Sequence, residues 1–250
     1  MCTVFLVRNR VAGWPLVAAN NRDEFTARRA LPPRVYAASG GRRCLASYDL
    51  SGGGSWWGYN NRGLLVFLTN RWVGDEPALA PRSRGELVLA MLARDEVADA
   101  LAELNGPAGV EFYNPFNLAV LSRQSGFFFS NYPRPQQLPL DDGYHFLGNG
   151  ALDADETMKA AAAGRLLGGF SGAESLTQVL GCLSRALRTP LPQDSIPPQG
   201  FNVRFDGYGT TSSLLLALPA TAAGRPLLHY CHGNPLAGHY QDFSSRFLLL

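Results

Sequence analysis

Cys2 is the residue of this 250-residue chain whose type and position are best suited to chemistry. Methionine aminopeptidases remove Met1 when the second residue is small, so Cys2 is expected to become the first residue. It would then carry a thiol with a reference pKa of about 8.5 and an α-amino group with one of about 7.7–8.0. An amine that is partly neutral at pH 7 can accept the thiol proton, which is how an N-terminal nucleophile works. The alternative is that Cys2 merely begins a strand.

Four polar side chains could complete such a site. Arg22 would favour the thiolate electrostatically, and Asp23 could hold the ammonium and orient the thiol. Asn70 and Asn149 each follow a predicted strand, where an amide can donate to a developing oxyanion. Asparagine is also an ordinary turn residue, so each amide has a purely structural alternative.

A predicted hairpin places the first of these residues together. The run 2–8 is rich in β-branched and aromatic residues, 9–13 is typical of a turn, and 14–19 returns as a second strand. Because the chain reverses, the end of the second strand lies near the start of the first. We therefore expect the polar residues 20–24 beside Cys2.

The rest of the chain alternates strands with helices. Ser83 and Glu86 have the spacing of a capping box at the start of the first helix. Loops are expected at 26–41 and at 191–200. The helices are predicted at 84–93, 97–104, 155–167 and 173–187, and the strands at 56–59, 63–69, 116–121, 127–130, 144–147, 212–218, 227–230 and 243–249. Two sheets between two helical layers, in a single domain over 1–250, would account for this order.

The composition argues against several classes of protein. Hydrophobic residues make up 46% and charged residues 17%, with a net charge of +2, which disfavours disorder. No apolar run is long enough to span a bilayer and no signal region is evident, so a cytoplasmic location is expected. We expect no nucleic-acid binding, because the basic residues are scattered. Salt-dependent DNA binding would need a loop cluster of arginines, namely Arg28, Arg29, Arg34, Arg42 and Arg43.

A series of short blocks resembles the NRDE family, also called the transport and Golgi organisation 2 family. Met1-Cys2 opens the match, and the sequence Asn-Arg-Asp-Glu occupies 21–24. The further blocks, in order, are Gly53–Gly58, Arg62–Asn70, Arg84–Leu87, Phe116–Leu118, Leu147–Asn149 and Gly207–Thr210.

This family in turn resembles the N-terminal nucleophile hydrolases, particularly the bile-salt hydrolase and penicillin V acylase branch. The resemblance implies an α+β fold, the four-layer αββα sandwich. It also implies that Cys2 is the nucleophile, Asp23 the branch's aspartate, and Asn70 and Asn149 its two asparagines.

Two arginine positions depart from the pattern. The branch has an arginine shortly before its aspartate, whereas here Arg22 directly precedes Asp23, and strand alternation would point it differently. Many family members have an arginine after Gly-Tyr-Gly-Thr, where this chain has Thr211.

The function implied is hydrolysis of a carbon–nitrogen bond in a small acyl amide, with no cofactor required. The alternative is a protein on the same fold that binds or traffics haem, lipid or acyl-CoA, since the resemblance links family members to haem mobilisation and to lipid or acyl-CoA metabolism. Haem ligation would fall to a histidine, and the chain has four: His145, His229, His232 and His239.

Overall fold

The computed structural model describes residues 2–74, 82–106, 109–154, 157–190, 201–221 and 223–250. The predicted loop at 191–200 therefore lies outside the described residues. The chain divides into two compact units, and each is built from two separate stretches of sequence. The first unit comprises residues 1–27 and 142–245, and the second comprises 28–141 and 246–250.

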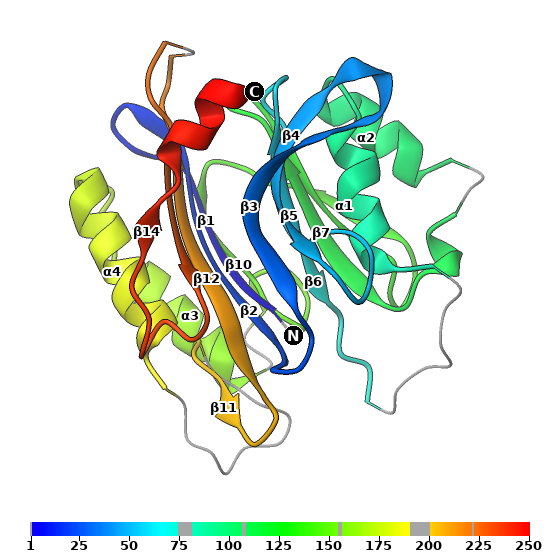
Figure 1. Ribbon diagram of the computed structural model, residues 1–250. Coiled ribbons are helices and arrows are strands. Elements are labelled where there is room, and N and C mark those ends of the chain that lie inside the picture. Colours follow the sequence, from blue (N-terminus) through cyan, green and yellow to red (C-terminus); the bar gives the residue numbers. More distant parts are fainter. Residues whose placement is uncertain (1, 75–81, 107–108, 155–156, 191–200, 222) are drawn as a thin grey trace. The chain divides into compact units, whose positions relative to one another are not determined.

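The first unit contains a seven-stranded antiparallel sheet in its described part, with two helices packed on it (Figure 1). In spatial order its strands are β10 (Gly143–Leu147), β1 (Cys2–Val11), β2 (Trp14–Phe25), β12 (Tyr208–Leu218), β13 (Leu227–His232) and β14 (Gln241–Asp242), with β11 (Arg204–Phe205) paired to β12. The helices are α3 (Met158–Gly168) and α4 (Leu176–Arg188).

The core of this unit explains which face of the β1–β2 hairpin the helices cover. Phe5 and Val7 of β1 and Ala19 of β2 pack with Ala163 of α3 and Leu183 of α4. Because side chains alternate along a strand, the odd-numbered residues of this hairpin face the helices and the even-numbered residues face away. The two faces therefore offer different surroundings to neighbouring residues at the end of the hairpin.

The second unit repeats the arrangement with its own core. Its sheet runs in chain order through β3 (Ala30–Ala37), β4 (Arg43–Asp49), β5 (Trp57–Asn60), β6 (Leu65–Asn70), β7 (Phe116–Leu121), β8 (Gly126–Ser130) and β9 (Gln136–Pro139). Helices α1 (Arg84–Leu92) and α2 (Val97–Leu104) bury apolar side chains such as Met91 and Leu104 against Val66 and Val120 of the sheet. The expected α+β class, with two antiparallel sheets flanked by helices, is confirmed.

Several predicted boundaries are wrong, and each error has a local cause. The second strand continues to Phe25 instead of stopping at 19, so the polar residues 20–24 lie within the strand. The predicted loop 26–41 contains β3, an edge strand whose bulge between Leu31 and Arg34 accommodates two prolines. Ser83 caps α1 by accepting from the Gly85 N–H instead of forming the predicted box.

The C-terminal segment is also different from its prediction. Residues 243–249 were expected to form a strand, but Ser244–Leu249 is a 3-10 helix. The Asp242 carboxylate accepts a hydrogen bond from the Ser244 N–H over 2.8 Å, which favours a turn at this point.

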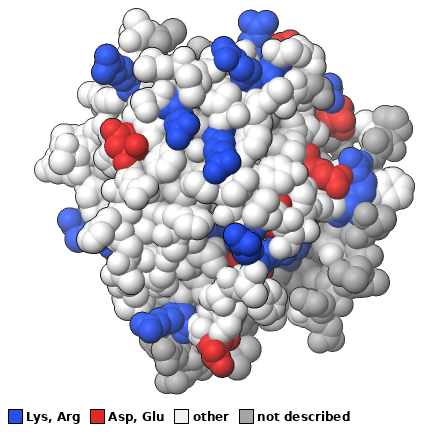
Figure 2. All heavy atoms as spheres, viewed as in Figure 1, with Lys and Arg blue, Asp and Glu red and all other residues white. Residues whose placement is uncertain are grey.

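Charged side chains are spread over the surface of the protein. On the face seen in Figure 2, basic and acidic side chains are scattered among uncharged ones. Within the arginine cluster considered above, Arg28 pairs with Asp49 over 2.9 Å and Arg42 pairs with Asp95. In the part of the chain that the structure describes, no helix has the length and apolar character needed to cross a bilayer.

Candidate active site

The predicted nucleophile lies at the start of the hairpin in the first unit. Cys2 is the first residue of β1 and stands directly opposite Arg22 of β2. Residues paired in this way project from the same face of a sheet. Both side chains therefore lie on the face turned away from α3 and α4, and both are buried.

Asp23 occupies the opposite face, next to the helices. Its carboxylate is fully buried, and Thr210 and Lys159 are among the side chains that donate to it. Thr210 of β12 donates to Oδ1 over 2.6 Å, and Lys159 Nζ of α3 donates to Oδ2 over 3.1 Å. The backbone carbonyl of Asp23 accepts a further bond, over 3.0 Å, from the Tyr208 hydroxyl. A buried charge requires such partners, because an isolated carboxylate would be strongly disfavoured there.

A bulge in β12 brings Thr211 to Arg22. The pairing of β12 with β2 slips between Thr210 and Ser212, which leaves Thr211 as the extra residue. Arg22 Nη1 donates to Thr211 Oγ1 over 3.0 Å, and the Thr211 hydroxyl donates to the Arg22 carbonyl over 3.2 Å. Thr211, noted in the sequence because many relatives have arginine there, is thus a direct partner of Arg22.

Asn149 lies at the same end of the sheet as Cys2. Val4 of β1 pairs with Leu147 of β10, so Cys2 and Asn149 each lie two residues beyond this pair in the direction of the same sheet end. The loop that carries Asn149 closes on β10 through Asp153, whose carboxylate accepts from the Phe146 N–H over 2.6 Å. The sheet register thus brings together the ends that carry Cys2, Arg22 and Asn149.

Asn70 belongs to the second unit. It is the last residue of β6, half-buried, and pairs with Phe116 of β7. Its proposed role beside Cys2 stays a prediction from the resemblance.

Sequence comparison assigns the family. The family described as Transport and Golgi organisation 2 matches residues 1–219. The chain belongs to this family. The human Transport and Golgi organization protein 2 homolog is 28% identical over 234 residues, which is 82% of each chain.

Two solved structures share the fold of this Transport and Golgi organisation 2 family member. A variant of the conjugated bile acid hydrolase from Clostridium perfringens matches with a TM-score of 0.54 and 10% identity, over 97% of this chain and 96% of that one. Penicillin V acylase from Agrobacterium tumefaciens matches with a TM-score of 0.52 and 12% identity, over 97% and 86%. The resemblance inferred from the short sequence blocks is therefore confirmed for the family and for the fold.

Burial favours the neutral form of the Cys2 thiol in this family member. Desolvation raises the pKa of Cys2, because the charged thiolate is disfavoured away from water. The nearby Asp23 carboxylate raises it further, while positive charge at the chain terminus and at Arg22 lowers it. With burial as the largest effect, the thiol needs a nearby base to become a nucleophile near pH 7.

Lys159 is a further member of this site, beyond the residues that the sequence predicts. It is the single lysine of the chain and lies in the first turn of α3, after the N-cap Thr157. A cation at a helix N-terminus is opposed by the helix dipole, so a nearby anion stabilises it there. That anion is Asp23, and the two side chains form an ion pair with 5% and 0% of their surfaces exposed.

The haem-binding alternative depends on the four histidines. Among the residues that the structure describes, His, Cys, Asp and Glu form no group of three or more that could hold a metal ion. His145 contacts Asp153 over 2.8 Å, and His232 is exposed at the end of β13. Haem binding therefore stays a prediction from the resemblance.

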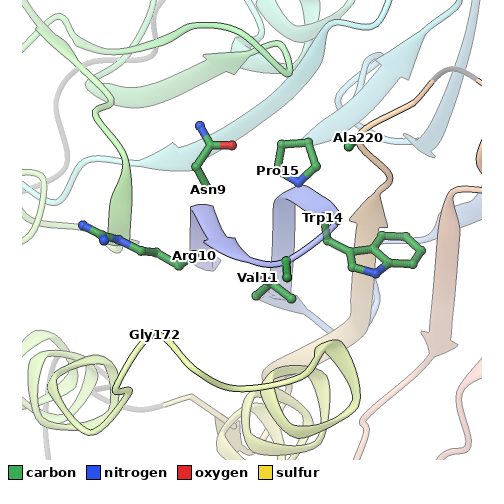
Figure 3. A pocket seen from close by; sticks show the side chains of 9 residues that line it. Asn9, Arg10, Val11, Trp14, Pro15, Gly172 and Ala220 are labelled. Carbon is green, nitrogen blue, oxygen red and sulfur yellow. The ribbon is translucent and has the colours of Figure 1, made fainter.

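A surface hollow lies at the other end of the hairpin from Cys2. It has a volume of about 370 Å³ and is lined by residues 9–15 of the β1–β2 turn, with Gly172 and Ala220 (Figure 3). Since β1 runs from Cys2 to Val11, this hollow is separated from the predicted nucleophile by the length of the strand.

Proposed function

We propose that this chain is an N-terminal cysteine amidohydrolase that cleaves the carbon–nitrogen bond of a small acyl amide. The observation that carries the proposal is the position of Cys2 as the first residue of β1, opposite Arg22 of β2. The buried carboxylate of Asp23 belongs to the next residue of β2. Two proteins of the same fold are named as a conjugated bile acid hydrolase and a penicillin V acylase. At their low identity this likeness supports the fold, and the reaction rests on the residues of this chain.

The proposed reaction begins when Met1 has been removed. The α-amine of Cys2 takes the thiol proton, and the sulfur forms a bond to the amide carbonyl carbon. The carbon–nitrogen bond then breaks, and the departing nitrogen takes the proton from the α-ammonium. Water attacks the resulting thioester, which releases a carboxylic acid and restores the thiol.

The surrounding polar residues have distinct tasks in this scheme. Asp23 accepts a hydrogen bond from the α-amine and orients it. Asn149 donates its amide hydrogen to the oxyanion that forms as sulfur attacks, a contribution typically worth about 3 kcal/mol. Arg22, on the same face as Cys2, stabilises negative charge on sulfur.

The decisive experiment combines mass spectrometry with an activity screen. The intact mass of the purified protein should lack Met1, and an electrophilic acyl-amide mimic should add to the N-terminal peptide. Wild type should hydrolyse at least one member of a panel of N-acyl amides, and Cys2→Ala should not. Cys182→Ala is the matched control, since Cys182 lies on α4 and should be dispensable. Retention of Met1, or equal labelling of wild type and Cys2→Ala, would contradict the proposal.

A further inference from the structure

The register of the hairpin determines which group meets Asp23. Cys2 is opposite Arg22, and Asp23 is the next residue of β2 beyond that pair, on the side of the Cys2 backbone nitrogen. The Cys2 side chain leaves the sheet on the face away from the helices, whereas Asp23 lies on the helix side. A backbone amine lies in the plane of the sheet and is accessible from either face. Asp23 is therefore placed to bind the α-amine of Cys2 rather than its thiol.

Asp23 already has one cationic partner. Lys159 Nζ lies 3.1 Å from Oδ2, and Thr210 occupies Oδ1 at 2.6 Å. A carboxylate has about four lone-pair sites, so it can accept a bond from the α-amine beside the bonds from these two groups. The α-amine would share the carboxylate with a lysine ammonium.

Sharing the carboxylate has a consequence for the base. A lone carboxylate beside an amine favours the charged form of the amine and would keep the amine protonated. A second cation on the same carboxylate offsets that effect. The α-amine ordinarily titrates near pH 7.7–8.0, so it can act as a base near neutral pH once the effect of the carboxylate is offset.

We propose that Lys159 is a positioning residue that offsets the negative charge of Asp23. The carboxylate can then orient the Cys2 α-amine without keeping the amine protonated. This inference rests on the proposed function, in which that amine is the base. Among the described residues, β2 and β12 bring further charged or titratable groups to Cys2 and Asp23, namely Arg22, Glu24 and Tyr208. Arg22 and Glu24 lie within 3.9 Å of each other, and the Tyr208 hydroxyl bonds the Asp23 carbonyl. None of these groups replaces the contact that Lys159 makes with the carboxylate itself.

The first test measures how pH controls the reactivity of Cys2. The protein is released from a cleavable fusion so that Cys2 is its first residue, and iodoacetamide labelling of the N-terminal peptide is followed by mass spectrometry from pH 5 to 10. Lys159→Met should label about tenfold more slowly than wild type near pH 7, and its rate should rise at higher pH. Lys159→Arg should restore the wild-type profile. Identical profiles for wild type and Lys159→Met, or a failure of Lys159→Arg to restore the profile, would overturn the inference.

A second measurement needs no substitution of Lys159. Because the chain has one lysine, protein grown with ¹³C-lysine gives a single Nζ-adjacent signal in an NMR spectrum. In protein with a free Cys2 amine, this signal should move with pH near neutrality, as the amine on the shared carboxylate titrates. In Cys2→Leu, which retains Met1, that inflection should disappear, whereas Cys2→Ala with its free amine should keep it. The same curve in all three proteins would overturn the inference.

These outcomes are separable from those of the proposed function. Labelling and NMR titration report the amine whether or not any amide is hydrolysed. Absence of turnover with a normal Lys159 response would count against the enzyme alone. Normal turnover with no Lys159 response would count against the role of Lys159 alone.

Discussion

Thr210 donates its hydroxyl hydrogen to Asp23 Oδ1 over 2.6 Å, from a strand that is paired with the strand carrying Asp23. The same hydroxyl oxygen accepts a hydrogen bond from the Val203 N–H over 2.9 Å. Thr210 therefore links the buried carboxylate to the segment that precedes β11. All three groups are buried, so no water replaces a lost bond at this point without rearrangement.

Thr210→Val should destabilise the protein. The substitution keeps the shape of the side chain but removes the hydrogen bonds that Thr210 makes with the Val203 N–H and with the Asp23 carboxylate. The free energy of unfolding should fall by about 2–3 kcal/mol. Urea unfolding would measure it. Thr210→Ser retains the hydroxyl and should recover most of the loss, and equal stability of the Val and Ser variants would contradict this role.

The Asp23–Lys159 pair should show strong coupling in a double-mutant cycle. Asp23→Asn and Lys159→Met each leave one buried charge without its partner, so each should cost about 3–5 kcal/mol of unfolding free energy. The double variant has neither charge, and its loss should be well below the sum of the two. Chemical denaturation of the four proteins tests this, and additive losses would show that the two charges do not interact.

Cys44 should make stability depend on pH above about 8.5. Burial raises the pKa of this thiol to about 11, because its charged form is disfavoured in the core of the second unit. The neutral thiol is thus favoured in the folded state. Its contribution is fully present below the unfolded pKa of about 8.5 and is lost as pH rises through 11, by up to about 3 kcal/mol.

The Cys44→Ala variant isolates this effect. Unfolding free energies of wild type and variant are compared between pH 7 and 11. The difference between them should shrink as pH rises from about 8.5 toward 11, because the thiol ionises in the unfolded wild-type chain while it stays neutral in the folded protein. A difference that is constant with pH would contradict the assignment.

Asn149→Ala should impair the proposed reaction without disrupting the fold. Loss of an oxyanion donor typically lowers kcat by about 10²–10³-fold. Turnover of an amide found in the activity screen measures this loss, and circular dichroism checks the fold. Asn61→Ala is the control, because Asn61 is exposed in the β5–β6 turn of the second unit. Equal activity of the two variants would remove Asn149 from the site.

Local signals in the sequence were enough for much of the fold. The helix predicted at 97–104 has those bounds in the structure, and the hairpin begins at Cys2 as expected. In these elements the periodicity and the turn residues are encoded within a few neighbouring positions. The strand β4 was not predicted, because its alternation is short and its partners are fixed by tertiary pairing.

The candidate site divides in the same way. Cys2, Arg22 and Asp23 were placed together because one hairpin joins them. Lys159 was missed because its partner is 136 positions away, and no local pattern links the two. In the sequence, Thr211 stands out only as a departure from the family pattern. Its bond to Arg22 depends on a bulge in β12 that no sequence pattern predicts.

The discontinuous first unit has a consequence during synthesis. On a ribosome that begins at Met1, the β1–β2 hairpin emerges first, but its flanking strands β10 and β12 follow only after residues 28–141 have been made. A two-stranded hairpin alone is marginally stable in water. The N-terminus of the nascent chain would therefore stay outside a complete sheet until β10 and β12 have been synthesised. During that time an aminopeptidase could remove Met1 and expose the Cys2 amine.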